Sequence, residues 1–126
     1  DVSAGLFLLA ATSNSEAVAL QTATSNNQSV AMTVLNAAIT HGSNDLGVVI
    51  GATQSLKEFG LQQLVDTDLG VPILAPGFGA QGAKLADLAK LFGASAPNVV
   101  PAMSRGLTGQ GPQAMANLID RAKLEL

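Results

Sequence analysis

Four short apolar segments, spread along the whole chain, constrain the fold of this sequence most strongly. They lie near residues 5–11, 46–51, 71–75 and 99–103, and none of them alternates polar with apolar residues. Continuous apolar runs of this length are typical of parallel strands that are buried on both faces. A short buried helix could mimic one such run, but four in series with helical segments between them favour strands.

The segments between these runs show the spacing of amphipathic helices. Residues 29–41 carry apolar pairs that recur every four positions, which gives one apolar stripe along a helix. The same stripe is present at 85–92 and 115–122, and a weaker helix is predicted at 56–64. The sequence therefore predicts a helix after each strand.

Several residues predict where the helices begin and end, and one polar segment predicts a loop. Pro112 is suited to a first helical position, and Gly42 and Gly93 lie where C-terminal caps are expected. Residues 22–28 are rich in Ser, Thr and Asn and are predicted to form a loop. Ser13 and Glu16 match an S-x-x-E capping box for the first helix.

The resulting order of elements, β-α-β-α-β-α-β-α, predicts an α/β fold with a parallel sheet and covering helices. A complete (β/α)₈ barrel takes roughly 250 residues, whereas this chain has 126. One domain over residues 1–126 therefore suits either a small open sheet or the (β/α)₄ half of a TIM (β/α)₈ barrel. Because the chain starts without Met and leads directly into a strand, we expect it to be a fragment of a longer protein.

The composition argues against several classes of partner. The formal charge is −3 and the six Lys and Arg residues are scattered, so nucleic-acid binding is not expected. The apolar runs are far shorter than a bilayer span, so no membrane partner is expected. The chain has no cysteine, which excludes disulfides and fits a cytoplasmic protein.

A glycine-rich turn between the third strand and its helix is the clearest functional signal. Residues 76–82 read P-G-F-G-A-Q-G, and the next strand ends in Ser104-Arg105-Gly106. Ligands of parallel α/β folds bind at the carboxyl ends of the strands. Backbone N–H groups at Gly79 and Gly82 together with the Arg105 guanidinium can converge there on an anion. The turn therefore predicts a phosphate site.

Other interpretations of this turn stay open at the level of the residues. It matches the G-x-G-x-x-G dinucleotide fingerprint, which expects an acid about 20 residues later at the end of the next strand. This chain has Ser104 and Arg105 at that place, although an arginine could accept the extra phosphate of NADP. The structural alternative for Arg105 is a surface arginine paired with an acid.

The four predicted strand ends carry hydroxyls, amides, backbone dipoles and one guanidinium, but no carboxylate, His or Lys. General acid–base catalysis needs such a group within hydrogen-bond reach of the substrate. We therefore expect these strand ends to bind a ligand and assign no catalytic residue to the chain. His41, the single histidine, is expected to end a helix and is given no function.

Taken in order, the strand-end segments resemble orotidine 5′-phosphate decarboxylase, specifically the C-terminal half of its bacterial subfamily with a P-G-x-G-A-Q-G turn. The resemblance rests on residues 5–14, 47–53, 76–82 and 104–106 and covers nearly the whole chain. It implies a half of a (β/α)₈ barrel and a homodimer. It also implies a carboxy-lyase that converts orotidine 5′-phosphate to uridine 5′-phosphate and CO₂ in pyrimidine nucleotide synthesis, with no metal and no cofactor.

The resemblance also implies roles for individual residues. Ser13 corresponds to a serine that hydrogen-bonds the pyrimidine, which replaces its interpretation as a cap alone. Pro76 lies beside the base, and Gln81 corresponds to a loop glutamine that reaches toward the phosphate. Arg105 and the Gly106 backbone correspond to the phosphate anchor.

The family's Asp-x-Lys-x-x-Asp catalytic motif does not occur in this sequence. One hypothesis is therefore a C-terminal half-barrel that is catalytic only with a missing N-terminal half-barrel. The other hypothesis is a non-catalytic phosphate- or nucleotide-binding module with a small open sheet.

Overall fold

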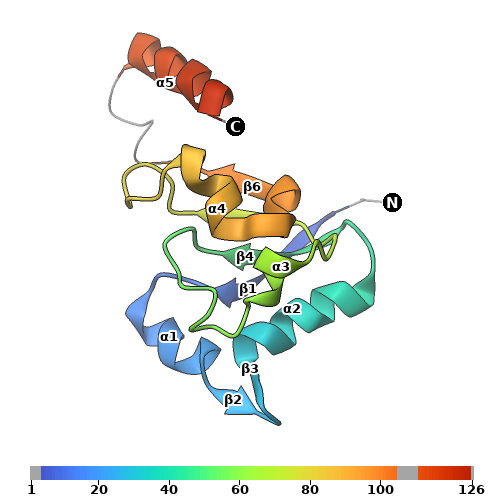
Figure 1. Ribbon diagram of the computed structural model, residues 1–126. Coiled ribbons are helices and arrows are strands. Elements are labelled where there is room, and N and C mark those ends of the chain that lie inside the picture. The colour runs from blue at the N-terminus through green and yellow to red at the C-terminus, as the bar shows by residue number, and fades with distance from the viewer. Residues whose placement is uncertain (1–3, 105–110, 126) are drawn as a thin grey trace.

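A four-stranded parallel sheet is the centre of the structure, a computed structural model that describes residues 4–104 and 111–125 (Figure 1). Its strands, in the spatial order β1-β4-β5-β6, are β1 (Leu6–Ala11), β4 (Leu46–Ile50), β5 (Ile73–Pro76) and β6 (Val99–Ala102). Each strand lies at one of the four apolar segments, so those segments do form parallel strands.

A helix follows each of the four strands, although not always at the predicted residues. They are α1 (Ser15–Gln21), α2 (Val30–His41), α3 (Gln63–Asp66), α4 (Leu88–Phe92) and α5 (Pro112–Glu125), with 3₁₀ segments η1 (Leu85–Asp87) and η2 (Gly93–Asn98) on either side of α4. The best-defined helix is α2, where the Ser29 hydroxyl accepts from the Met32 N–H at 2.9 Å and left-handed Gly42 ends the helix. No helix in the described part of the chain is long and apolar enough to cross a membrane.

The two faces of the sheet differ in what covers them. The register places Leu8, Val48, Ile73 and Val99 in one row across the sheet. The central members of this row are fully buried, in a core to which α2 contributes Ala31, Leu35 and Ala38. Helices therefore cover this face.

The opposite face carries a second apolar row, formed by Leu9, Val49, Leu74 and Val100. The outer members are exposed, Leu9 at 63% and Val100 at 52%. The expectation that all four strands are interior is therefore wrong for β1 and β6, which are the two edges of this sheet among the described residues. Val49, in the middle of this row, is buried and Leu74 is half-buried, so the fold is a half-barrel-like α/β sheet whose second apolar face is uncovered at its two edge strands.

Residues 22–28 are not the loop that the composition predicts. They include most of a small antiparallel hairpin, β2 (Thr24–Ser25) and β3 (Gln28–Ser29). Its two turn residues, Asn26 and Asn27, have φ angles of 52° and 62°. Two-residue hairpin turns of type I′ require positive φ at both central positions, and asparagine tolerates this conformation better than most residues.

The helix predicted at 56–64 is also largely wrong. Only α3 is an α-helix in this region, and it begins at Gln63. Gly60 takes a left-handed φ of 71°, which interrupts a right-handed helix. The apolar periodicity arises instead because a compact turn buries Leu56, Phe59 and Leu61 in the core and α3 buries Leu64 there.

Candidate phosphate- and nucleotide-binding site

Because all four strands are parallel, their carboxyl ends lie at the same end of the sheet. Backbone hydrogen bonds connect the segments that follow them. The Gly51 N–H donates to the Ala11 carbonyl at 2.8 Å, and the Ala52 N–H donates to the Pro76 carbonyl at 2.7 Å. The segments after β1, β4 and β5 therefore form a connected rim, as the sequence predicts for a ligand site.

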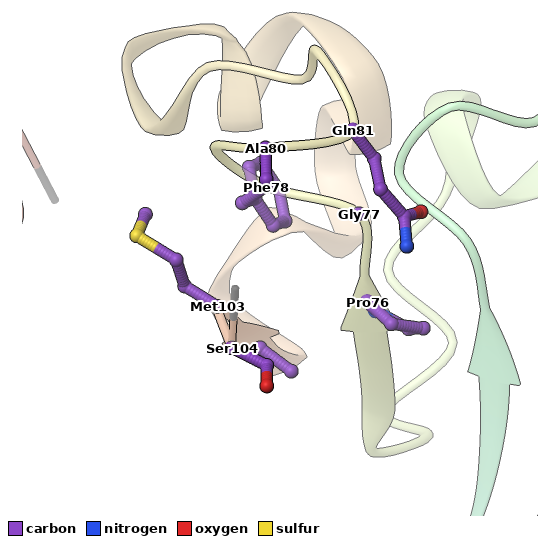
Figure 2. A pocket seen from close by; sticks show the side chains of 8 residues that line it. Pro76, Gly77, Phe78, Ala80, Gln81, Met103 and Ser104 are labelled. Atoms are coloured by element: carbon purple, nitrogen blue, oxygen red, sulfur yellow. The ribbon is translucent and has the colours of Figure 1, made fainter. Parts of the chain in front are cut away.

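A cleft of about 150 Å³ lies at this rim, between the ends of β5 and β6 (Figure 2). Its lining comes from two segments, with Pro76, Gly77, Phe78, Ala80 and Gln81 on one side and Ala102, Met103 and Ser104 on the other. Pockets for drug-sized molecules measure about 300–1,000 Å³, and a water molecule takes about 30 Å³. The cleft is thus large enough for a phosphate group but too small to enclose a whole nucleotide.

Positive φ angles shape the glycine turn. Gly77, Gly79 and Gly82 have φ angles of 116°, 77° and 105°. Side chains other than hydrogen strain this part of the backbone map, so glycine is required for the turn to adopt this path. The turn leaves residues 79–82 exposed, which makes them accessible to a ligand.

Hydrogen bonds inside the turn use two of the N–H groups that the sequence assigns to phosphate. The Gly79 N–H donates to the Ala83 carbonyl and the Gly82 N–H to the Gly79 carbonyl, both at 2.9 Å. Among the described residues, the N–H groups of Ala80 and Gln81 have no backbone acceptor. The phosphate role of Gly79 and Gly82 stays a prediction, and it requires these bonds to be exchanged for bonds to the ligand.

The Gln81 side chain folds back along the turn. Figure 2 shows it pointing toward Gly77 and away from Met103 and Ser104. A Cβ placed on Gly77 would lie 3.4 Å from Gln81 Oε1 and 3.5 Å from Thr53 Cγ2. The Gln81 amide therefore lies between the glycine turn and the segment after β4, on the side of the cleft that faces Thr53.

Met103, the last residue of the fourth apolar segment, lines the cleft and was not predicted as a site residue. A Cβ on Gly79 would lie 3.3 Å from both Cγ and Sδ of Met103. The Met103 side chain thus packs on the glycine turn and closes one wall of the cleft. Its position immediately before Ser104 in the strand-end segment is the signal that could have identified it.

Ser13 lies at the same edge but outside the cleft. It is exposed, and its hydroxyl makes no hydrogen bond to another described residue. Its strand, β1, is separated from β5 by β4, which corresponds to about 10 Å at the usual strand spacing. That distance suits a ligand with two recognition groups, one at each end.

The capping box predicted for Ser13 and Glu16 is not formed. The helix α1 begins one residue later, with Asn14 as its N-cap and no side-chain cap hydrogen bond. Hydrogen bonds from the backbone N–H of Glu16 itself and from the Asn14 and Ser15 side chains lower the pKa of the Glu16 carboxyl. Ser13 is therefore not used as a cap and remains accessible to a ligand.

Arg105 and Gly106, the predicted phosphate anchor, lie outside the described residues. The last described residue before them, Ser104, lines the cleft. At the described strand ends, the polar side chains are hydroxyls and amides, a set that can bind a neutral or anionic ligand by hydrogen bonds. No three His, Cys, Asp or Glu side chains come together as a metal site in residues 4–104 and 111–125.

Known proteins resemble this chain closely in sequence. Orotidine 5′-phosphate decarboxylase of Streptomyces coelicolor is 44% identical over 98% of this chain, and that of Nocardioides sp. is 38% identical over 98%. The resemblance to the orotidine 5′-phosphate decarboxylases is confirmed. This chain spans 45% and 46% of the lengths of these relatives, which is consistent with a C-terminal half. No family model matches the chain.

Solved structures support the fold. The structure of Leishmania donovani UMP synthase matches 96% of this chain with a TM-score of 0.69 at 23% identity, and 27% of that protein is covered. Leishmania donovani OMP decarboxylase matches the same share with a TM-score of 0.66 at 22% identity, with 47% of that protein covered. The half-barrel prediction is therefore confirmed over the described sheet.

Proposed function

We propose that this chain is the nucleotide-binding part of an orotidine 5′-phosphate decarboxylase, the carboxy-lyase that releases CO₂ from orotidine 5′-phosphate to form uridine 5′-phosphate. The observation that carries the proposal is the 44% identity over 98% of the chain to the Streptomyces coelicolor enzyme. The phosphate-sized cleft at the carboxyl edge of the sheet supports it, because ligands of (β/α)₈ barrels bind at that edge.

In this proposal the rim holds the two ends of one nucleotide. The glycine turn, with Gly79 and Gly82, and the Arg105–Gly106 segment bind the phosphate. Ser13 hydrogen-bonds the pyrimidine, while Pro76 and Gln81 lie between the two ends. The separation of about 10 Å between the ends of β1 and β5 supports this division, since two strand spacings are of the order of the length of a nucleotide.

Binding of the phosphate contributes to catalysis at a distance. Interactions with a part of the substrate that does not react can offset the cost of distortion and desolvation at the reacting centre. The acids and lysine that perform the chemistry belong, by the resemblance, to an earlier strand than those of this chain. The described rim therefore supplies binding energy, and the proton transfer is assigned to the complementary half-barrel.

The exposed outer part of the second apolar face supports a complementary half-barrel as the partner. Leu9 and Val100 expose apolar side chains at the two edge strands, and exposed strand edges are prone to pairing with further strands. A second set of four strands would bury the exposed outer members of the second apolar row, Leu9 and Val100, and close an eight-stranded barrel. We further propose a homodimer of the completed barrel and a cytoplasmic location, both on the resemblance.

Mixing two separately purified parts tests this function. This chain would be combined with the part of the Streptomyces coelicolor enzyme that it does not match, and CO₂ release from orotidine 5′-phosphate would be measured. We expect no turnover by either part alone and turnover by the mixture. The matched control is the same mixture with Arg105→Ala in this chain.

Two outcomes would contradict the proposal. Decarboxylation by this chain alone would show that it contains its own catalytic groups. Tight binding of uridine 5′-phosphate by a stable monomer, with no turnover in the mixture, would instead support the alternative of a non-catalytic nucleotide-binding module. Light scattering on the isolated chain separates a monomer from a self-associating half-barrel.

A further inference from the structure

We infer that Gln21 is a positioning residue for Ser13, acting through Thr12 to hold the loop that contacts the pyrimidine. The inference rests on the proposed function, because it assumes that Ser13 binds the base. It concerns a residue outside the cleft and outside the motifs that carry the resemblance.

The burial of Gln21 is unusual for its residue type. It is 6% exposed and is the one buried residue of α1, whose side chains are otherwise exposed or half-buried. Glutamine is mostly exposed in folded proteins, and burying its amide is unfavourable unless it is hydrogen-bonded. An apolar residue would pack at this position without that requirement, so the hydrogen bonds of Gln21 are the feature to explain.

Those hydrogen bonds all lead to Thr12. Gln21 Oε1 accepts from the Thr12 backbone N–H at 2.9 Å and lies 3.2 Å from the Thr12 hydroxyl. The Thr12 N–H follows the last residue of edge strand β1, where the ladder to β4 ends. On the side of β1 that faces away from β4, no described strand offers an acceptor, and Gln21 supplies one.

Thr12 in turn holds the other side of Ser13. Its hydroxyl lies 2.6 Å from Asn14 Oδ1, which makes Asn14 the nearer acceptor for the single hydroxyl proton. Both neighbours of Ser13 are thus fixed by the same set of side chains, while Ser13 itself is exposed and unused by it. This arrangement restricts the backbone at Ser13 and leaves its hydroxyl available to a ligand. Figure 1 shows α1 beside the carboxyl end of β1, where this contact is made.

The test compares Gln21→Met with Gln21→Glu in this chain. Methionine has a similar length but no carbonyl oxygen, whereas glutamate retains the acceptor. The matched control is Gln63→Met, because Gln63 is a half-buried helical glutamine whose amide contacts the Met32 sulfur at 3.4 Å, away from the rim. Two quantities are measured: hydrogen exchange of the Thr12 and Ser13 amides without ligand, and affinities for uridine 5′-phosphate and for ribose 5-phosphate, which lacks the base.

We expect Gln21→Met to speed exchange at Thr12 and to weaken uridine 5′-phosphate binding about threefold to tenfold, the scale of one hydrogen bond, with ribose 5-phosphate unaffected. Gln21→Glu should restore the preference for the base, and Gln63→Met should leave it unchanged. Adding Gln21→Met to Ser13→Ala should cause little further loss, because the two residues act on one contact.

Any other result would overturn either the inference about Gln21 or the proposed function. Unchanged amide exchange in Gln21→Met would overturn the inference without reference to any ligand. Faster exchange with an unchanged preference for uridine 5′-phosphate, or equal losses for both ligands, would leave the proposed function standing and reduce Gln21 to a structural role. Failure of the unmodified chain to bind either ligand, both alone and mixed with the complementary part, would overturn the proposed function, and the inference with it.

Discussion

The loops after β1 and β5 lie at the same edge of the sheet but are shaped by different means. The loop after β1 is held by side chains, through the hydrogen bonds of Gln21 and Asn14 with Thr12. The turn after β5 is held by its own backbone, through bonds among Gly77, Gly79, Gly82 and Ala83. One loop therefore depends on the identity of its side chains, and the other on the absence of side chains.

This difference matches what each loop is proposed to bind. A pyrimidine edge presents specific donors and acceptors, so a loop that fixes one serine hydroxyl can distinguish it. A phosphate presents equivalent oxygens to any N–H group, so a flexible glycine backbone and an arginine suffice. Variants of the loop after β1 should therefore change the affinity for uridine 5′-phosphate only. Variants of the turn after β5 should change the affinities for uridine 5′-phosphate and ribose 5-phosphate alike.

The largest effect is expected on the phosphate side, for Arg105→Ala. Loss of a guanidinium from a phosphate contact should weaken binding by about 2–4 kcal/mol if the pair is largely desolvated. Because the phosphate is common to both ligands, uridine 5′-phosphate and ribose 5-phosphate should lose equal free energy in calorimetric titrations. An unchanged affinity for both would remove Arg105 from the site.

A glycine-to-alanine pair tests whether the turn depends on its backbone. Gly79 and Gly111 have nearly equal φ angles, 77° and 78°, but only Gly79 has Met103 within 3.3 Å of an added Cβ. Each alanine should cost about 1–2 kcal/mol of stability from the left-handed conformation, and Gly79→Ala should cost more. Thermal unfolding measures this difference.

The same pair separates local from global effects on binding. Gly79→Ala should weaken binding of both phosphorylated ligands, whereas Gly111→Ala, which precedes α5, should leave both affinities unchanged. If the two variants changed ligand affinity equally, the turn would have no special part in the site.

A smaller effect is expected on the base side, for Thr12→Val. Valine keeps the backbone N–H that donates to Gln21 and removes the hydroxyl that donates to Asn14. The loss should be about 0.5–1 kcal/mol in the affinity for uridine 5′-phosphate, with ribose 5-phosphate unaffected. Thr33→Val is a suitable control, because its hydroxyl donates to the Ser29 carbonyl within α2. Equal losses for both ligands would contradict the division between the loops.

The smallest effect is a pH dependence at the start of α1. The pKa of Glu16 is lowered from its usual value near 4.5 by hydrogen bonds from its own backbone N–H and from Asn14 and Ser15. A lowered pKa in the folded chain stabilises that chain above the unfolded pKa, and the contribution is lost as pH falls through the folded pKa. An NMR titration should place the Glu16 midpoint below 4.5, whereas a midpoint at or above 4.5 would show that this hydrogen bonding is not maintained in solution.

Most of the fold could be predicted because burial leaves a periodic signal. The four apolar runs gave the strands, and capping residues such as Gly42 gave helix ends. The hairpin at 24–29 could not be predicted, since its strands are two residues long and polar, and only the φ angles of Asn26 and Asn27 define it. The segment at 56–64 imitates a longer helix because its four apolar residues are all buried, three of them from a compact turn and Leu64 from α3.

The site was less predictable for a related reason. The order of strand ends predicted a site at the carboxyl ends of the strands, and a cleft lies at these ends beside the glycine turn. A single hydrogen bond from a side chain leaves no periodic pattern in the sequence, so the contact of Gln21 with Thr12 could not be predicted. The capping prediction for Ser13 failed because α1 begins one residue later, after Asn14, whose side chain accepts from the Thr12 hydroxyl and makes no cap hydrogen bond.

Titration of uridine 5′-phosphate into ¹⁵N-labelled chain, followed by amide chemical shifts, tests the central claim most directly. A second cleft serves as the internal control. It measures about 140 Å³, lies near the amino ends of β4 and β5, and is lined by residues that include Gly42, Ser43 and Gly70. The account predicts shifts at Ser13 and at residues 79–82 with uridine 5′-phosphate, and at residues 79–82 alone with ribose 5-phosphate. Shifts confined to the opposite cleft, or identical shifts with both ligands, would contradict it.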